Sequence, residues 1–139
     1  MKTAVVYWSG TGNTEMMAQE VLQGMKDQGA EAEMIEVSSF QAEKMGDYDA
    51  IAFGCPSMGA EQLEESEFEP MFTACEGRLS GKNIALFGSY GWGDGEWMRS
   101  WESRCSDGGA NLACDSVICN EAPDDDALAA CRELGASLA

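Results

Sequence analysis

The fold of this chain is decided by the stretch Tyr7-Trp8-Ser9-Gly10-Thr11-Gly12-Asn13-Thr14-Glu15. An apolar run at residues 3–7 precedes it and predicts a buried strand, and a segment of helical periodicity follows at residues 15–28. A strand-to-helix turn of this kind points several backbone N–H groups at one spot, at the positive end of the helix dipole. Its glycines allow close approach of the backbone, and its hydroxyls add donors. The stretch therefore predicts a phosphate site, with a plain tight turn and helix cap as the alternative.

The kind of phosphate ligand is narrowed by what this stretch lacks. A dinucleotide fingerprint requires a third glycine where Glu15 stands, and a P-loop requires a lysine, but none occurs between Lys2 and Lys26. A hydroxyl-rich loop without a cation suits a phosphate monoester that neutral donors hold.

Composition places the chain among single globular domains. Its 139 residues, 45% of them hydrophobic, predict one domain over residues 1–139. We expect a cytoplasmic protein, because no apolar run approaches membrane-spanning length and no signal peptide opens the chain. A net charge of −17 argues against nucleic acid and anionic membranes and favours basic protein partners, although charge for solubility alone would explain it equally well. With no histidine, imidazole catalysis and imidazole metal ligation are excluded.

The six cysteines are spread along the chain without any Cys-x-x-Cys spacing. Even the closest pair, Cys114 and Cys119, fits no common zinc or iron–sulfur pattern. We expect buried free thiols and no metal.

Strand and helix patterns alternate along the whole chain. Strands are predicted at residues 3–7, 32–37, 48–55, 82–89 and 110–119, and helices at 15–28, 66–75, 96–105 and 127–138, with a short helical turn at 41–44. Glutamates alternate with apolar residues in the second strand, as is typical of a sheet edge, and Asn111 and Asp115 interrupt the fifth. Pro70 belongs in a first turn or a break, and residues 124–126 cap the last helix. The order predicts an α/β fold, a doubly wound five-stranded parallel sheet of order 2-1-3-4-5 with helices on both faces.

Three loops with unusual residues follow strands 1, 3 and 4, at residues 9–14, 56–62 and 90–95. In this strand order they are neighbours at the carboxyl edge of the sheet, where ligands bind. Met58 and Trp92 are large apolar side chains on glycine-flanked loops, and stacking on a flat ligand explains them. A Trp92 folded back onto the surface and an ordinary packing role for Met58 are the alternatives. Tyr90 is either a wall of the site or an ordinary half-buried aromatic.

A phosphate and a flat ring together describe flavin mononucleotide (FMN), and at this point the chain resembles the short-chain flavodoxins of anaerobic bacteria. The resemblance is carried by residues 9–15, by Met58-Gly59-Ala60-Glu61 with residues 63–70, and by residues 88–95. It implies a flavodoxin-like fold and non-covalent FMN, bound by Ser9, Gly10, Thr11, Gly12, Asn13, Thr14, Pro56, Ser57, Met58, Gly59, Ala60, Glu61, Ser89, Tyr90, Gly91, Trp92, Gly93 and Asp94.

The resemblance also implies a role for each loop. The phosphate would lie on residues 9–14 and the isoalloxazine between Met58 and Trp92. The Gly59 carbonyl would turn toward flavin N5 in the semiquinone, and Glu61 would hold the ring N3–H through its carboxylate or its amide. Amides of residues 89–95 would face the pyrimidine side. Ala60 departs from the Asp or Asn that the family often has there, which predicts a smaller stabilisation of the semiquinone.

The function implied is that of a low-potential one-electron carrier that shuttles between semiquinone and hydroquinone and replaces ferredoxin. We expect a monomer. We also expect no catalytic residue, because neither Cys55 nor Ser89 has a general base beside it. Acids at the flavin edge would steer ferredoxin- or flavodoxin-dependent oxidoreductases that have basic docking surfaces; they are Glu61, Glu64, Glu65, Glu67 and Asp94. A small FMN-dependent quinone or nitro reductase is the alternative. A flavodoxin module cut from a larger enzyme is less favoured. A phosphorylated receiver domain is also disfavoured, because it needs an aspartate at the end of the first strand, where Trp8-Ser9 stands.

Overall fold

Six strand segments and four α-helices alternate in the computed structural model, which describes all residues from 1 to 139. The strands are β1 (Lys2–Tyr7), β2 (Glu31–Glu36), β3 (Ala50–Gly54), β4 (Asn83–Tyr90), β5 (Asn111–Leu112) and β6 (Val117–Asn120). The α-helices are α1 (Asn13–Asp27), α2 (Phe68–Cys75), α3 (Glu96–Asp107) and α4 (Asp125–Leu138). Short 3₁₀ turns are η1 (Val37–Ser39), η2 (Ala42–Asp47) and η3 (Glu76–Arg78).

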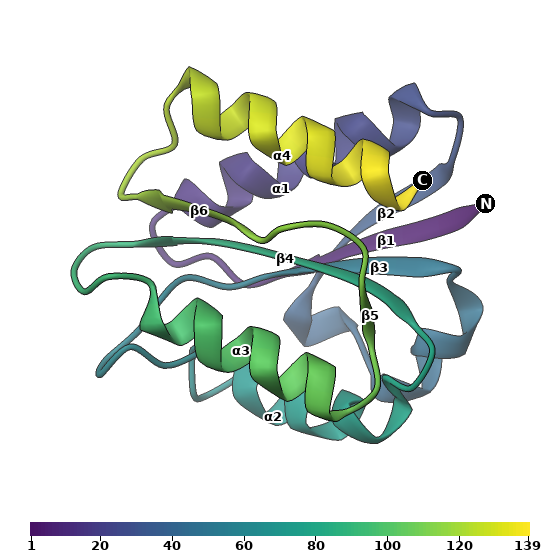
Figure 1. Cartoon of the computed structure of the whole chain (residues 1–139), viewed down its shortest axis with the longest axis horizontal. Helices are drawn as coiled ribbons and strands as arrows, with labels where there is room; N and C mark the ends of the chain where they lie inside the picture. Colours follow the sequence, from purple (N-terminus) through teal and green to yellow (C-terminus); the bar gives the residue numbers. More distant parts are fainter.

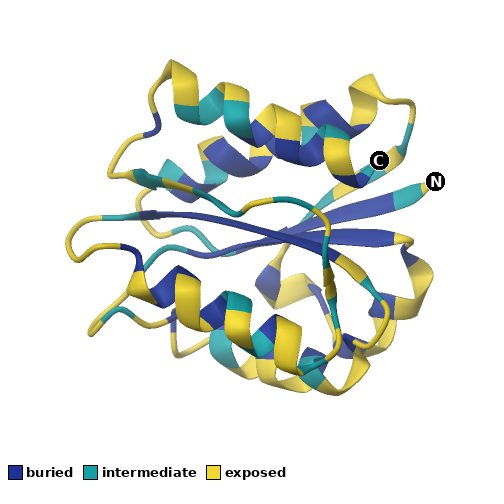
Figure 2. Ribbon diagram, in the orientation of Figure 1, coloured by how far each residue is buried: buried dark blue, intermediate teal, exposed yellow.

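The strands form one parallel sheet in the order β2-β1-β3-β4-β5, and β6 also pairs with β4. This confirms the predicted order. Helices α1 and α4 cover one face of the sheet and α2 and α3 the other (Figure 1). β3 is buried along its whole length, as is expected of a strand covered on both faces (Figure 2). β2 pairs only with β1, so its alternating pattern does mark an edge.

The fifth predicted strand is divided. β5 and β6 both pair with β4, but residues 113–116 between them lie in no strand. The interruption includes Asp115, as predicted, whereas Asn111 does not interrupt the strand because it belongs to β5 and pairs with Asn83 of β4. Other boundaries shift by one to three residues. Pro70 is the third residue of α2, in the first turn, where a missing N–H costs no helical bond. The Asp124 carboxylate caps α4 by accepting from the Ala127 N–H at 2.8 Å, which confirms the predicted cap.

Two hydrophobic clusters lie on either side of the sheet. On the α2–α3 side the rings of Phe53 and Phe72 meet edge to face at 5.3 Å, and Phe72 meets Trp101 at 5.6 Å. On the other side α1 and α4 pack closely because glycines stand at their crossing. A Cβ atom on Gly24 would lie 2.0 Å from the Arg132 carbonyl oxygen, and one on Gly135 2.0 Å from that of Val21.

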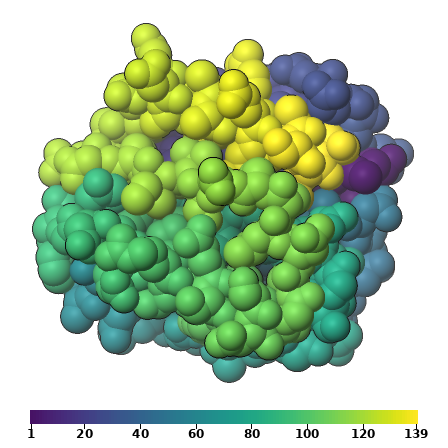
Figure 3. All heavy atoms as spheres, in the orientation of Figure 1, coloured from purple at the N-terminus to yellow at the C-terminus, as the bar shows by residue number.

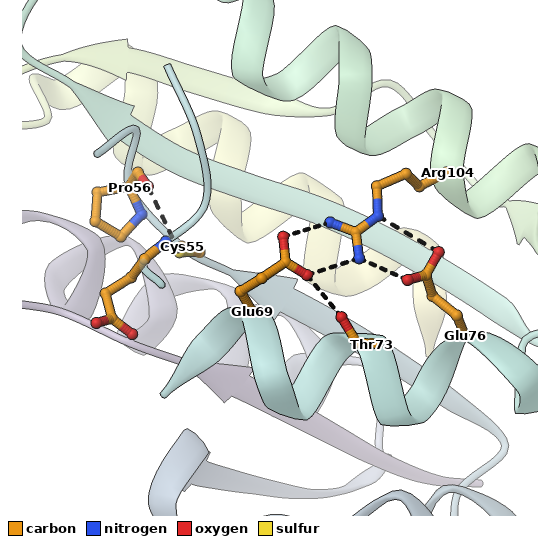
Figure 4. A network of polar contacts seen from close by, with 7 residues as sticks. Cys55, Pro56, Glu69, Thr73, Glu76 and Arg104 are labelled. Atoms are coloured by element: carbon orange, nitrogen blue, oxygen red, sulfur yellow. Dashed lines mark hydrogen bonds and ion pairs between the residues drawn. The ribbon is translucent and has the colours of Figure 1, made fainter. Parts of the chain in front are cut away.

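An ion-pair network joins α2 to α3 (Figure 4). The Arg104 guanidinium donates to both carboxylate oxygens of Glu69 at 2.8 Å and to Glu76 at 2.6 Å. Thr73 donates to Glu69, and the guanidinium lies 5.1 Å from the centre of the Phe72 ring. Planar bidentate pairing of this kind fixes the angle between the helices as well as their distance.

The cysteines are all free thiols, as predicted. Cys55, Cys75, Cys105 and Cys131 are buried, whereas Cys114 and Cys119 are only partly buried because they lie at the open edge of the sheet. Burial raises the pKa of the Cys75 thiol to about 11. None of the helices combines the length and apolar character needed to cross a bilayer.

Candidate functional site

A pocket of about 480 Å³ lies where the strands end at their carboxyl edge. The first predicted loop supplies one wall, the second and third supply another, and the segment after β6 closes it. We call it the three-loop pocket; it is lined by Trp8, Ser9, Gly10, Thr11, Asn13, Thr14, Pro56, Ser57, Met58, Ser89, Tyr90, Gly91, Glu121 and Ala122. The structure therefore brings the three predicted loops together in one cavity.

The first loop has the geometry expected of an anion site, and one of its hydroxyl donors has no hydrogen-bond partner. Gly12 has a φ of +97°, in the region that glycine adopts without strain, and it leads directly into α1. The Ser9 hydroxyl oxygen accepts from the N–H groups of Gly12 at 3.1 Å and Glu15 at 3.3 Å. The Thr14 hydroxyl is buried, at 1% exposure of the residue, and has no hydrogen-bond partner. A buried unpaired hydroxyl at a helix N-terminus beside a cavity fits a ligand oxygen.

The second loop is a tight turn that closes on itself. Met58 and Gln62 exchange two backbone hydrogen bonds, at 2.7 and 2.8 Å. Between them Gly59 and Glu61 have φ values of +54° and +53°, so this turn already uses left-handed backbone on both sides of Ala60. The Met58 side chain is 39% exposed, although it lines the pocket. The turn thus holds an apolar side chain at the pocket mouth.

The Glu61 carboxylate does not line the pocket and contacts the third loop and α3. Its Oε1 accepts from the backbone N–H of Glu96 at 3.2 Å, at the first turn of α3. A Cβ atom on Gly93 would lie 2.4 Å from the same oxygen, so the carboxylate packs on the third loop. A contact of Glu61 with the ring N3–H, through its carboxylate or its amide, stays a prediction. Glu61 connects the second loop to the third.

The third loop presents its tryptophan to solvent. Trp92 is 62% exposed, the highest value among the large apolar side chains of the chain. Arg99 holds the loop by donating to the Asp94 carbonyl at 3.0 Å and to its carboxylate at 2.9 Å. The Tyr90 ring packs on Trp97 at 5.5 Å between centres and also lines the pocket, so it is both a wall of the site and a half-buried aromatic.

Seven predicted site residues belong to these loops without lining the cavity. They are Gly12, Gly59, Ala60, Glu61, Trp92, Gly93 and Asp94. Gly12 shapes the first loop, and the other six form the outer parts of the second and third loops. These outer parts flank the pocket mouth.

Three lining residues were not predicted. The Trp8 indole lies against Gly10, where an added Cβ would be 2.9 Å from it, and donates to Glu67 at 3.3 Å. Glu121 and Ala122 follow β6, and the Glu121 N–H donates to the Tyr90 carbonyl at 2.7 Å. The fifth strand must end at the same edge as the others, so parallel topology was a signal that its following loop would join the site.

Glu64 was predicted to be one of the acids at the flavin edge that steer a partner. This prediction is wrong, because its side chain is buried and caps the start of α2. The residue is 5% exposed, and its carboxylate accepts from the N–H groups of Glu67 and Phe68 at 2.8 and 2.9 Å, and from the N–H and hydroxyl of Ser66. Burial alone would raise the pKa of this carboxyl, but the hydrogen bonds outweigh burial and lower it. Glu64 therefore orders the start of α2 in its ionised form.

The electrostatic character of the three-loop pocket is neutral to acidic. None of its lining residues is Lys or Arg, and Glu121 adds a carboxylate. Arg99, on the helix that follows the third loop, is paired with Asp94 and Glu96. An anion in this pocket would be held by backbone and hydroxyl donors alone.

The chain is similar to known proteins over nearly its whole length. The flavodoxin family model matches residues 5–135. The chain belongs to the flavodoxin family. It is 45% identical over 135 residues to the flavodoxin of Megasphaera elsdenii, covering 97% of this chain and 96% of that one. It is 44% identical to the flavodoxin of Clostridium beijerinckii, with 97% of each covered. The solution structure of two-electron reduced M. elsdenii flavodoxin superposes with a TM-score of 0.90, over 98% of this chain and 97% of that one.

Membership of the flavodoxin family settles the cofactor and the class of activity. The cofactor is FMN, and the protein transfers electrons and is not an enzyme. The residues present fit this group: the unpaired Thr14 hydroxyl suits a phosphate oxygen, and exposed Met58 and Trp92 offer apolar surface near the mouth. FMN supplies the redox chemistry, and the flavodoxin fold supplies the binding site.

Proposed function

We propose that this flavodoxin is a low-potential one-electron carrier that uses FMN between its semiquinone and hydroquinone forms and takes the place of ferredoxin with redox enzymes. The observation that carries the proposal is the absence of Lys and Arg from the lining of the three-loop pocket, in a chain of net charge −17. Each carboxylate about 10 Å from a negatively charged reduced flavin disfavours it by on the order of 0.8 kcal/mol at an effective dielectric constant of about 40. Several such charges lower the potential of the second reduction.

The phosphate is assigned to the first loop. Gly10 and Asn13 supply backbone N–H groups, and Ser9, Thr11 and Thr14 supply hydroxyls. Gly12 shapes the loop, and its own N–H donates to Ser9. The Thr14 hydroxyl carries this assignment, because it is the one lining donor that is buried without a partner. Neutral donors at a helix N-terminus bind a phosphate without cancelling its charge.

The ring is assigned to the space between Met58 and Trp92. Both side chains are exposed, at 39% and 62%, and a flat ring would cover apolar surface that otherwise meets water. Pro56, Ser57, Ser89, Tyr90 and Gly91 form the wall behind. Gly93 and Asp94 shape the loop that carries Trp92, and Arg99 holds it.

The peptide between Gly59 and Ala60 is assigned the proton-linked contact with the ring edge. A carbonyl that accepts from a protonated flavin N5 contributes about 1 kcal/mol. The flanking φ values of +54° at Gly59 and +53° at Glu61 show a turn of unusual backbone geometry, in which rotation of one peptide changes φ at Ala60. A positive φ costs Ala more than Gly, so we propose a smaller contribution here than a glycine would give.

The proposed partners are ferredoxin- or flavodoxin-dependent oxidoreductases with basic docking surfaces, met in the cytoplasm by a monomer. The exposed acids Glu65, Glu67 and Asp94 lie on or next to the second and third loops. Their charges would speed encounter with a basic surface, and the rate would fall as salt screens them.

The test is a potentiometric titration of the FMN-loaded protein followed by visible absorbance. We expect two separated one-electron steps, with the second well below the corresponding potential of free FMN. A single two-electron step, or a second potential at or above that of free FMN, would refute the one-electron carrier. Rapid oxidation of NADPH by the purified protein would support the reductase instead.

A further inference from the structure

The largest cavity of the molecule lies outside the three-loop pocket. It is a groove of about 770 Å³ between β6 and α4, here called the edge groove. Val117, Cys119 and Asp115 line it from the strand side, and Ala127, Ala130 and Leu134 from α4. In Figure 3 the segment around β6, in light green, lies beside α4, in yellow, on the face turned to the viewer.

The edge groove runs along an open edge of the sheet. β6 pairs with β4 on one side and with no strand on the other. Strands at such an edge present unpaired N–H and C=O groups, which form a template for another extended chain. Val117 and Cys119 pack on the α1–α4 side of the sheet, and Ile118 points to the opposite side, toward Gly95. The side of the edge that faces the groove is therefore largely apolar.

Helix α4 leaves the groove open because it turns small side chains toward it. Ala127, Ala130 and Ser137 lie on one face of α4 at helical spacing, and all three line the groove. The neighbouring Ala129 is exposed and does not line it. A large side chain at position 130 would fill the groove, whereas the same side chain at 129 would point into solvent.

The charged side chains at the rim of the edge groove are all negative. The carboxylates of Asp115, Asp126 and Glu133 are exposed and line it, and no lysine or arginine does. Asp124 also lines the groove, but its carboxylate is committed to the cap of α4. A second copy of this chain would bring like charges together, at a net charge of −17 for each copy.

We propose that the edge groove docks an extended basic segment of another protein, which adds to β6 as a further strand. Backbone pairing with β6 holds the segment. On the side of the segment that faces α4, small apolar side chains at the centre cover Val117 and Ala130, and Lys or Arg at the two ends meet the rim carboxylates. Ala122 lines both the groove and the three-loop pocket, so the docked segment lies beside that pocket. The proposal does not depend on the redox function proposed above.

The binding test uses the FMN-loaded protein and the peptide acetyl-Lys-Thr-Val-Thr-Val-Thr-Arg-amide, whose Lys, two Val and Arg lie on one side of an extended strand. In ¹H–¹⁵N spectra we expect saturable shifts concentrated at residues 115–120 and along the groove face of α4, with slower amide exchange in β6. The same peptide N-methylated at every residue has no backbone N–H to donate to β6 and should bind at least about tenfold more weakly. Shifts confined to residues 58–67 and 92–94, or no saturation, would overturn the proposal.

Two matched variants test the groove itself. Ala130→Trp should weaken peptide binding at least about tenfold and Ala129→Trp less than about twofold, since only the first fills the cavity. Dispersed ¹H–¹⁵N spectra and retained FMN absorbance in both variants show that they fold. Equal effects of the two would overturn the proposal. So would a dimer of the free protein in sedimentation that Ala130→Trp abolishes.

A pair of charge variants separates the rim from net charge. The triple substitution Asp115→Lys, Asp126→Lys and Glu133→Lys reverses the rim. The substitutions Glu31→Lys, Glu43→Lys and Asp107→Lys change net charge equally at exposed sites outside the groove. At about 0.15 M salt we expect the rim variant to lose about tenfold or more in peptide affinity and the control much less. Equal losses of affinity in the two variants would mean that peptide binding depends only on the net charge of the protein, which contradicts docking in the groove.

Discussion

The carboxylate of Glu61 accepts a hydrogen bond from the backbone N–H of Glu96 at 3.2 Å, which ties the loop of Met58 to the first turn of α3. No side chain of the N-cap residue, Gly95, can serve α3 in this way. Glu61 therefore acts as a cap supplied from another loop, and the pairing has a measurable consequence.

The first prediction concerns Glu61 in the FMN-free protein. Replacing it with Ala should lower the free energy of unfolding by about 1 kcal/mol, the usual loss when a helix loses its cap. Glu61→Gln keeps an acceptor oxygen and should lose less. Urea unfolding followed by circular dichroism measures this, with Glu65→Ala as an exposed control. An unchanged midpoint in Glu61→Ala would show that the contact contributes nothing.

The second prediction concerns the unpaired hydroxyl of Thr14. Thr14→Val removes a buried donor that has no partner, so the FMN-free protein should keep or gain stability, by up to about 1 kcal/mol. The same change should weaken FMN binding by about 1–2 kcal/mol, because a phosphate oxygen loses a donor. Urea unfolding and a fluorescence titration with FMN give the two values. A loss of stability without a loss of affinity would place the role of Thr14 in the fold alone.

Trp92 is the subject of the third prediction. Trp92→Ala should weaken FMN binding by about 1–2 kcal/mol, as expected for loss of an aromatic stack with its buried area, and should raise the hydroquinone potential. Trp92→Phe should retain much of both. Because the side chain is 62% exposed, the stability of the FMN-free protein should change little. Unchanged affinity and potential in Trp92→Ala would show that this ring does not stack.

A fourth prediction follows from the buried cap Glu64. Its hydrogen bonds lower the pKa of the folded state below that of the unfolded chain, about 4.3. Its contribution to stability is thus fully present above that value and is lost as the pH falls through the folded pKa. At pH 7, Glu64→Gln should reduce the free energy of unfolding by about 1–3 kcal/mol, and the variant should lose less stability than the parent on acidification. Urea unfolding at a series of pH values tests both, and parallel pH profiles would contradict the assignment.

The fifth prediction concerns the turn at Ala60. Ala60→Gly removes the steric cost of a positive φ and should increase the separation between the two one-electron potentials by an amount equivalent to about 1 kcal/mol. The potentiometric titration used for the parent protein measures it. Ala60→Val, which tolerates positive φ even less, should decrease the separation. Identical separations in all three proteins would mean that residue 60 does not change backbone conformation.

Much of the fold was predictable because its signals are local. A strand's burial, a helix's periodicity and a cap such as Asp124 depend on residues a few positions apart, so the strands and helices within residues 1–90 followed from the pattern to within a few residues. The meeting of the loops after strands 1, 3 and 4 was predictable from topology, because the carboxyl ends of parallel strands lie at one edge of the sheet. The cap by Asp124 and the position of Pro70 in the first turn of α2 were confirmed.

The partners of individual side chains were not predictable. Glu64, Glu61 and Asp94 all belong to glycine- and acid-rich loops, yet Glu64 is buried in a ring of N–H groups, Glu61 caps a distant helix and Asp94 pairs with Arg99. Trp8 and Glu121 line the pocket through packing between segments far apart in the chain. The interruption of the fifth strand at Asp115 was predicted, but the pairing of both short segments, β5 and β6, with β4 was not.

By itself the sequence determined the alternation of strands and helices, the strand-to-helix turn at residues 9–14 and the excess of negative charge. The tertiary structure decided which carboxylates meet solvent, which hydroxyl of the first loop is left unpaired, and that an open groove lies between β6 and α4. The reason is physical: backbone preferences act over a few residues, whereas desolvation and hydrogen-bond pairing depend on which distant segments come into contact.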